Sequence, residues 1–160
     1  MTQLRELELE GTQVTDAGLE HLKGLTRLEE LDLDGTKVTD AGLAHLEGLT
    51  QLRDLELGAA KITDAGLRHL LGLPHLQKLG LKGTQITDAG LQPLKGSINL
   101  QKIDVEGSKV TNAGLQQFNS LMHIGESNPD PNSIRCRKQS FQPPRNRFRS
   151  LRAKCWKGRV

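Results

Sequence analysis

Apolar residues recur along this chain at a constant interval of 24 residues. Leucines mark the start of each interval, and the segments between them are near copies of one another. A fixed period of this length indicates a stack of equivalent supersecondary units that pack against their neighbours. We therefore assign a repeat domain to residues 1–124, with repeats at residues 4–27, 28–51, 52–75, 76–99 and 100–123.

Two hydrophobic periods follow each other within a repeat. The opening segment, LRELELEG in the first copy, alternates apolar and polar residues and predicts a short, half-buried strand. The glycine that ends this segment marks a turn. Apolar residues at helical spacing then continue from Ala17 to the glycine at Gly24. Each repeat is predicted to contain a strand, a turn, a short helix and a return loop.

Polar residues and a glycine recur at the start of each predicted helix. We expect the threonine and aspartate columns to cap the helices, and we expect the glycine to allow close packing of neighbouring backbones or a tight helix start. The threonines are Thr15, Thr39, Thr63, Thr87 and Thr111. The acidic or amide column is Asp16, Asp40, Asp64, Asp88 and Asn112, and the glycines are Gly18, Gly42, Gly66, Gly90 and Gly114.

Stacking of these units determines the expected architecture. One repeat buries too little apolar surface to order its own backbone, so each must pack on the next. Parallel strands then lie about 4.8 Å apart on one face, and helices line the other through right-handed crossovers. The predicted fold class is α/β: a right-handed solenoid with strands on its concave face and short helices on its convex face.

The strand pattern followed by GT-x-[VI]-TDAGL-x-x-L-x-GL resembles the repeats of bacterial leucine-rich repeat proteins. It is also similar to the cysteine-containing repeats of F-box ubiquitin-ligase receptors, although no F-box precedes it here. The family places asparagine or cysteine in one slot, and this chain departs from that pattern. We expect a ladder of hydroxyl groups there, interrupted by the alanine, since the residues are Thr12, Thr36, Ala60, Thr84 and Ser108.

Strand alternation places the third, fifth and seventh residues of each repeat on the concave face. Eight of the first nine are acidic, and lysines appear later. One interpretation is an acidic trough for a basic protein segment, with the lysines contacting an acidic flank of the partner. The alternative is that these charges serve solubility alone. The candidate partner-binding residues are Glu6, Glu8, Glu10, Glu30, Asp32, Asp34, Asp54, Glu56, Lys78, Lys82 and Lys102.

No motif for catalysis, a cofactor or a metal stands out in the sequence. There is no nucleophile beside a base, no phosphate-binding glycine loop and no HExxH motif. The histidine column His21, His45 and His69 is expected on the outer face, without a metal. We predict a non-catalytic protein–protein interaction module. The alternatives are a passive repeat segment of a longer scaffold or surface protein, and a substrate-recognition adaptor in ubiquitin-like protein turnover.

Charge divides the chain into two unlike parts. Residues 1–123 hold 12 basic and 17 acidic residues, whereas residues 124–160 hold 10 and 2. Acidic strands disfavour nucleic acid for the repeats. We predict that residues 125–160 form a disordered basic tail. Four interpretations stay open: it binds nucleic acid or anionic lipid, it folds back onto the acidic trough, it is a frame-slip product, or it is a solvated linker.

Compartment and chain ends give weaker signals. No export signal or run of 18 apolar residues is present, so the chain as written is expected to be cytoplasmic. Cys136 and Cys155 are too few for a disulfide framework or a zinc site. Neither end has an evident polar cap, which predicts a partial chain or end-to-end association.

Overall fold

The computed structural model describes residues 3–95 and 99–121, with side chains up to Phe118. Its strands form one parallel sheet in chain order, and paired residues lie 24 positions apart, as in Leu7↔Leu31. The strand register therefore equals the sequence period. The strands are β1 (Glu6–Glu8), β2 (Glu30–Asp32), β3 (Asp54–Glu56), β4 (Lys78–Gly80) and β5 (Lys102–Asp104).

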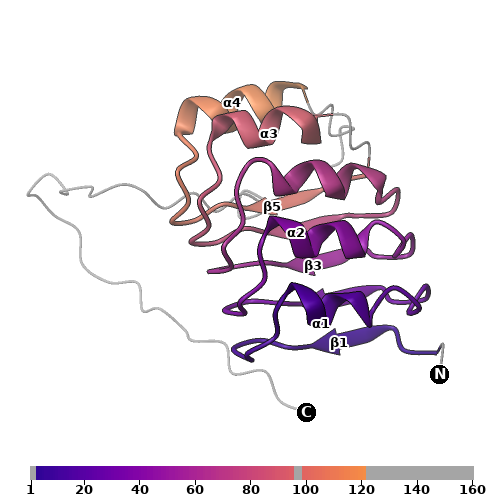
Figure 1. Ribbon diagram of the computed structural model, residues 1–160. Helices are drawn as coiled ribbons and strands as arrows, with labels where there is room; N and C mark the ends of the chain where they lie inside the picture. The colour runs from indigo at the N-terminus through magenta and orange to yellow at the C-terminus, as the bar shows by residue number, and fades with distance from the viewer. Residues whose placement is uncertain (1–2, 96–98, 122–160) are drawn as a thin grey trace, which may run out of the picture.

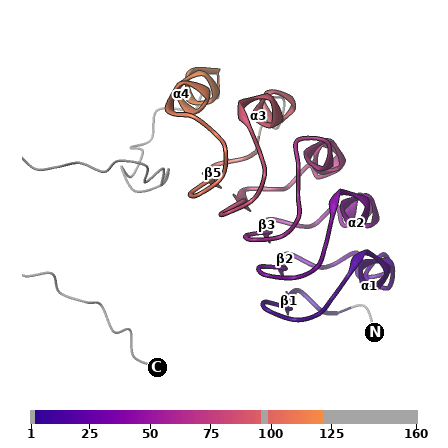
Figure 2. The same cartoon turned by 60° about the vertical axis from the view of Figure 1, so that its left-hand side comes forward.

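A helical segment follows every strand and lies on the other side of the stack (Figure 1). The stack is curved, with the strands on the inside of the bend and the helices on the outside (Figure 2). The predicted solenoid, with a concave strand face and a convex helical face, is confirmed. The helical segments are α1 (Asp16–Glu20), α2 (Asp40–Leu43), η1 (Ala44–Leu46), η2 (Gly66–Gly72), α3 (Asp88–Leu94) and α4 (Asn112–Leu121).

The core consists of the repeated leucine, isoleucine and valine slots between the two layers. Leu31 and Leu33 of the second repeat are 1% and 0% exposed, whereas Leu7 and Leu9 in the same slots of the first repeat are only partly buried. The first repeat differs because a described neighbour covers it on one side alone. Burial in this fold comes from the adjacent repeats.

Aspartates of the TDAGL segments bond to the next repeat. Each carboxylate accepts hydrogen bonds from the backbone N–H and the hydroxyl of the threonine 23 residues later, at 2.5–2.8 Å. These aspartates were expected to cap their own helices, and their carboxylates bond the next repeat instead. Some of the threonines do cap: the Thr63 and Thr87 hydroxyls accept from Ala65 and Ala89 N–H. The bonded pairs are Asp16–Thr39, Asp40–Thr63, Asp64–Thr87 and Asp88–Thr111.

The recurring helix glycine makes room for that carboxylate. A Cβ atom at Gly42, Gly66, Gly90 or Gly114 would overlap Oδ1 of the preceding repeat's aspartate. Packing is the reason for the glycine, as expected, but the group that it accommodates is a side chain. At Gly18 no aspartate lies opposite, and a Cβ would meet only Val14 Cγ1 at 3.1 Å.

The hydroxyls of the asparagine/cysteine slot bond within their own repeat. Thr36 Oγ1 donates to the Leu33 carbonyl at 2.7 Å, and Thr12, Thr84 and Ser108 donate equivalently. The hydroxyls occupy the expected column, interrupted at Ala60, and each donates to a carbonyl of its own repeat. Buried Ala60 lacks the hydroxyl, but its backbone N–H still reaches the Leu57 carbonyl at 3.3 Å.

Within residues 3–95 and 99–121, every helix is too short or too polar to span a lipid bilayer. The predicted tail at residues 125–160 lies outside the described residues.

Candidate protein-interaction face

The register of the sheet arranges the predicted partner-binding residues in three rows across the concave face. Residues of one row are paired neighbours on adjacent strands, or follow those strands directly. All of the predicted residues thus belong to one surface. The first row is Glu6, Glu30, Asp54, Lys78 and Lys102; the second is Glu8, Asp32, Glu56, Gly80 and Asp104; the third is Glu10, Asp34, Gly58, Lys82 and Glu106.

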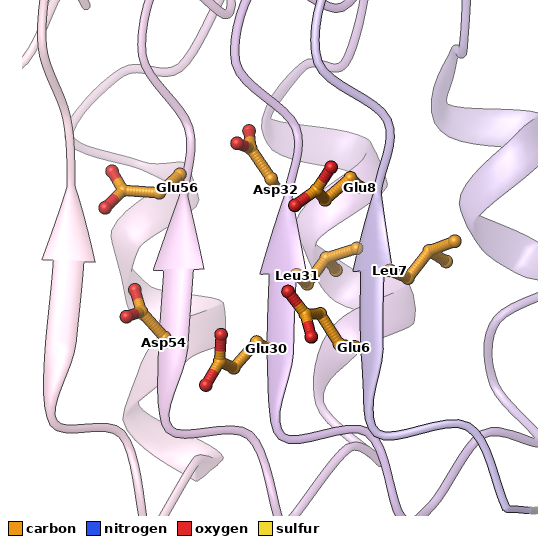
Figure 3. A pocket seen from close by; sticks show the side chains of 8 residues that line it. All are labelled: Glu6, Leu7, Glu8, Glu30, Leu31, Asp32, Asp54 and Glu56. Atoms are coloured by element: carbon orange, nitrogen blue, oxygen red, sulfur yellow. The ribbon is translucent and has the colours of Figure 1, made fainter. Parts of the chain in front are cut away.

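A hollow of about 130 Å³ lies over the first three strands. Six carboxylates surround it, and Leu7 and Leu31 complete its lining (Figure 3). Unit charges about 5 Å apart repel by on the order of 1 kcal/mol even in water. Such a surface therefore has a strong negative potential that favours a cationic ligand. The carboxylates belong to Glu6, Glu8, Glu30, Asp32, Asp54 and Glu56.

Two of the three lysines on this face are engaged within the protein. Lys78 Nζ donates to Asp54 Oδ2 at 2.7 Å, and this contact raises the pKa of Lys78 above its usual value. Lys82 Nζ lies 3.8 Å from Glu106 Oε2. Lys102 has no ion pair among the described residues. In the described structure, Lys78 of β4 is the one cation that pairs with the acidic residues contributed to the three rows by the first three repeats.

Glycines in two of the rows leave space for carboxylates of the preceding strand. Glu56 lies over Gly80, where a Cβ atom would overlap the carboxylate. Partial burial, together with the nearby charges of Asp54 and Asp34, raises the pKa of Glu56 to about 7. The sequence signal was the glycine itself, in a slot that elsewhere holds a charged residue.

Asp34, in the third row, likewise lies against a glycine of the next repeat. Its Oδ1 accepts the Gly58 N–H at 2.5 Å, and its carboxylate would collide with a side chain at that position. Desolvation raises the pKa of Asp34, while the Gly58 bond opposes the rise. Asp54 Oδ1 is also buried and has no hydrogen-bond partner among the described residues. Several carboxylates of this face are thus shielded from water and only partly compensated.

A second hollow, of about 350 Å³, lies beside the third row where the strands turn. Its floor is bare backbone, because the turn position holds glycine with φ of 65–72° in four repeats. Ala59 occupies the same position with φ of 55°, a conformation that costs a side-chain-bearing residue about 1–2 kcal/mol. Sequence reasoning missed this strip, although the column Gly11, Gly35, Gly83 and Gly107 signals it.

Among the described side chains, the convex face has no comparable cluster of charges. His69 Nδ1 lies 2.6 Å from Glu47 Oε1, which is an ordinary surface contact between repeats. In residues 3–95 and 99–121, no three histidine, cysteine or acidic side chains are arranged to hold a metal ion.

Family models of two kinds match the chain. Both describe leucine-rich repeats; one covers residues 26–86 and the other covers residues 1–23. No curated protein matches the sequence.

Three solved structures match the chain at low sequence identity. The structure of leiomodin-1 actin-binding site 2 superposes with a TM-score of 0.57 at 19% identity, over 76% of this chain and 80% of that one. Internalin C2 from Listeria monocytogenes has a TM-score of 0.46 at 23% identity, over 73% and 68%. Internalin F from the same organism has a TM-score of 0.45 at 23% identity; the match covers 73% of this chain but only 46% of internalin F.

A structural likeness at sequence identities this low shows the fold alone. The fold is nevertheless consistent across three observations: the family matches, the 24-residue register of the sheet and the likeness to leiomodin-1. Together they identify the described part of this chain as a leucine-rich repeat solenoid.

Proposed function

We propose that this protein is a non-catalytic interaction module that holds a basic segment of a partner polypeptide. The binding surface is the acidic face, defined as the row carboxylates of the first three repeats. The observation that carries the proposal is their convergence on one concave surface with a single paired cation, Lys78. The acidic face comprises Glu6, Glu8, Glu10, Glu30, Asp32, Asp34, Asp54 and Glu56.

Energetics favour a cationic partner. Each carboxylate on this face repels its neighbours, so a lysine or arginine that enters the hollow relieves several unfavourable contacts at once. Electrostatic attraction also speeds encounter and fixes the orientation of the bound segment. Solubility alone gives no reason for a carboxylate oxygen such as Asp54 Oδ1 to be shielded from water.

A polypeptide is the favoured class of partner. The concave surface is long and shallow, which suits an extended chain, and a phosphate backbone would be repelled by the carboxylates. Leiomodin-1, whose similar structure is named for an actin-binding site, gives a precedent for a protein partner. Lys78, Lys82 and Lys102 lie at the other end of the face and would contact an acidic flank of the same partner.

The test uses synthetic peptides of twelve residues that vary the number and spacing of lysine and arginine. Affinity is measured by fluorescence anisotropy at 150 mM salt for the wild type and for Glu30→Gln/Asp32→Asn, which removes two charges from the hollow. We expect at least a fivefold loss of affinity, and a further loss as salt rises.

The matched control is Glu20→Gln/Glu47→Gln, which removes the same charge from the convex side. Unchanged peptide affinity is expected there, because neither side chain lies on the concave face. Equal losses in both variants, or no loss in Glu30→Gln/Asp32→Asn, would refute the proposal.

A further inference from the structure

The second hollow of the concave face has a continuous floor of main chain. The turns that form this floor are in contact, since a Cβ atom at Gly35 would lie 3.7 Å from Gly11 Cα. One at Gly83 would likewise lie 3.8 Å from Ala59 N. The space above the turns is about 350 Å³. A volume of this size lies in the range of pockets that receive ligands, about 300–1,000 Å³.

The floor is apolar because its polar groups are already bonded. The N–H groups of Gly11 and Gly35 each donate to a carbonyl of the next repeat at 2.7 Å, and that of Ala59 does so at 2.6 Å. What remains on the floor is glycine Cα atoms and the methyl group of Ala59, which is exposed. An apolar group that settles there displaces water without leaving a polar group unpaired.

Charged side chains determine which apolar group fits the second hollow. Glu10 and Asp34 line it from the first and second repeats, and Lys82 lines it from the fourth. An aromatic ring has a negative face and a positive edge, so its edge suits the carboxylates and its face suits the ammonium group. An aliphatic side chain gains neither contact. The lining therefore favours an aromatic side chain.

The two hollows follow one another along the strands. Residues of the first and second rows line the hollow of six carboxylates, whereas the third row and the turn after it line the second hollow. Both hollows include residues of the first three repeats. A line that joins them therefore runs along the strands and not across them. It covers about three residues of strand, or roughly 10 Å.

An extended polypeptide has the spacing that this arrangement requires. Its alternate side chains point to one face and lie about 6.6–6.8 Å apart, as do alternate residues of the strands beneath. Two basic residues at alternate positions then lie over the first and second rows. The next residue on that face lies over the third row, beside the second hollow. A helix would cover the same 10 Å in about seven residues, so spacing distinguishes the two conformations.

We propose that the partner segment lies along the strands and has the order basic, any, basic, any, aromatic, in either chain direction, with its aromatic side chain in the second hollow. This inference rests on the proposed function, because the basic pair occupies the acidic face. It adds the direction of the bound segment and a requirement that charge alone does not impose. The acidic flank that meets the lysines is then a separate segment of the same partner.

Twelve-residue peptides with lysine at positions 4 and 6 test the spacing. Tryptophan is placed at position 2 or 8, which gives the proposed order in either direction, or at position 12, which gives the helical spacing. The reference peptide has alanine at these positions. By fluorescence anisotropy at 150 mM salt, tryptophan at position 2 or 8 is expected to raise affinity at least fivefold. Tryptophan at position 12, or leucine at the better position, is expected to raise it less than twofold.

Substitution of Ala59 locates the aromatic side chain on the protein. Ala59→Asn places a larger neutral side chain on the floor, and asparagine tolerates the φ of 55° at this position. It is expected to abolish the gain from tryptophan while leaving the affinity for the alanine peptide unchanged. Ala59→Gly is the matched control, since it keeps the floor bare and is expected to retain the gain. Circular dichroism checks that both variants are folded.

The inference is overturned if tryptophan gives no gain at position 2 or 8, if position 12 or leucine does equally well, or if the gain survives Ala59→Asn. Peptides that lose affinity in Glu30→Gln/Asp32→Asn but gain nothing from tryptophan would overturn this inference and leave the proposed function intact. A gain from tryptophan without any loss in Glu30→Gln/Asp32→Asn would refute the proposed function and, with it, the basic pair required here.

Discussion

At the scale of single residues, Glu56 shows how a missing side chain sets the chemistry of a charged one. Gly80 on the next strand leaves a space into which the Glu56 carboxylate folds. There it is partly desolvated and surrounded by Asp54, Asp34, Asp32 and Asp104. The charged form is therefore disfavoured, and the pKa of Glu56 rises to about 7.

This environment predicts a pH-dependent stability. The folded carboxyl binds its proton more tightly than the unfolded one, whose pKa is 4.5, so stability falls as pH rises from about 4.5 to about 7. Because Glu56 remains half exposed, solvent screening reduces the effect to on the order of 1 kcal/mol. Glu56→Gln is expected to remove this part of the slope and to stabilise the protein at pH 8. Urea unfolding of both proteins at pH 5, 6, 7 and 8 measures how the free energy of unfolding depends on pH.

Glu8→Gln is the matched control, since Glu8 is an exposed member of the same row. Its pH profile is expected to run parallel to that of the wild type. A Glu56→Gln profile that also runs parallel would contradict the assigned environment.

At the scale of elements, consecutive repeats are joined by a unit of aspartate, threonine and glycine. Asp64 bonds the N–H and hydroxyl of Thr87 and fills the space that Gly90 leaves open. The glycine thus weakens its own helix while allowing a charged hydrogen bond between helices. Hydrogen bonds to charged groups contribute about 1.5–3 kcal/mol each, more than the helix loses by having glycine in place of alanine.

This unit of aspartate, threonine and glycine predicts that mutations at Asp64 and Gly90 have coupled effects on stability. Gly90→Ala is expected to cost about 1–3 kcal/mol, because its Cβ displaces the Asp64 carboxylate. Asp64→Ala is expected to cost about 2 kcal/mol by removing the bonds to Thr87. In the Asp64→Ala background, Gly90→Ala becomes nearly neutral, since the carboxylate is gone and only the contact with Ile86 Cγ2, at 3.0 Å, remains. Chemical denaturation of the four proteins gives the coupling energy.

Gly18→Ala provides the control within the same chain. It has the same position in its repeat and a similar contact with an apolar neighbour, but no aspartate lies opposite. It is expected to change stability by less than about 0.5 kcal/mol. Additive costs of Gly90→Ala and Asp64→Ala would show that the two sites are not coupled.

At the scale of the whole molecule, every interface between inner repeats is built from the same slots. The strand register advances by 24 residues at each step, and the Asp–Thr bonds repeat with it. The stability of such a stack is approximately a sum of repeat and nearest-neighbour terms. A whole repeat is consequently an exchangeable part, whereas a fraction of one is not.

Deletion of residues 52–75 tests this equivalence. Asp40 would then meet Thr87 and Gly90, and Glu30 would take the place of Asp54 beside Lys78, so the new interface keeps the Asp–Thr bonds and one opposite-charge pair. We expect a folded, cooperative protein of lower stability, with a denaturant m-value reduced by roughly a fifth. Circular dichroism with urea titration provides the measurement. Deletion of residues 52–63, half a repeat, is expected to abolish cooperative unfolding. Similar behaviour of the two deletions would contradict the idea that whole repeats are equivalent.

Much of the fold and the membership of the acidic face could be predicted from the sequence, because both follow from local periods. Alternation around Leu31 and Leu33 gives the strand and its two faces, and the spacing to Leu55 gives the register. The role of Asp64 could not be predicted. An aspartate that caps its own helix and one that bonds the next repeat occupy the same place in the sequence pattern.

The sequence by itself determined the unit, the order of the strands and which side chains share a surface. These properties depend only on spacing along the chain, and identical spacing forces identical stacking. The tertiary structure decided what each charge does: that Lys78 neutralises Asp54, that Glu56 lies over Gly80, and that Asp64 bonds Thr87 of the next repeat. Those outcomes depend on distances between side chains of adjacent repeats, and a period contains no information about such distances.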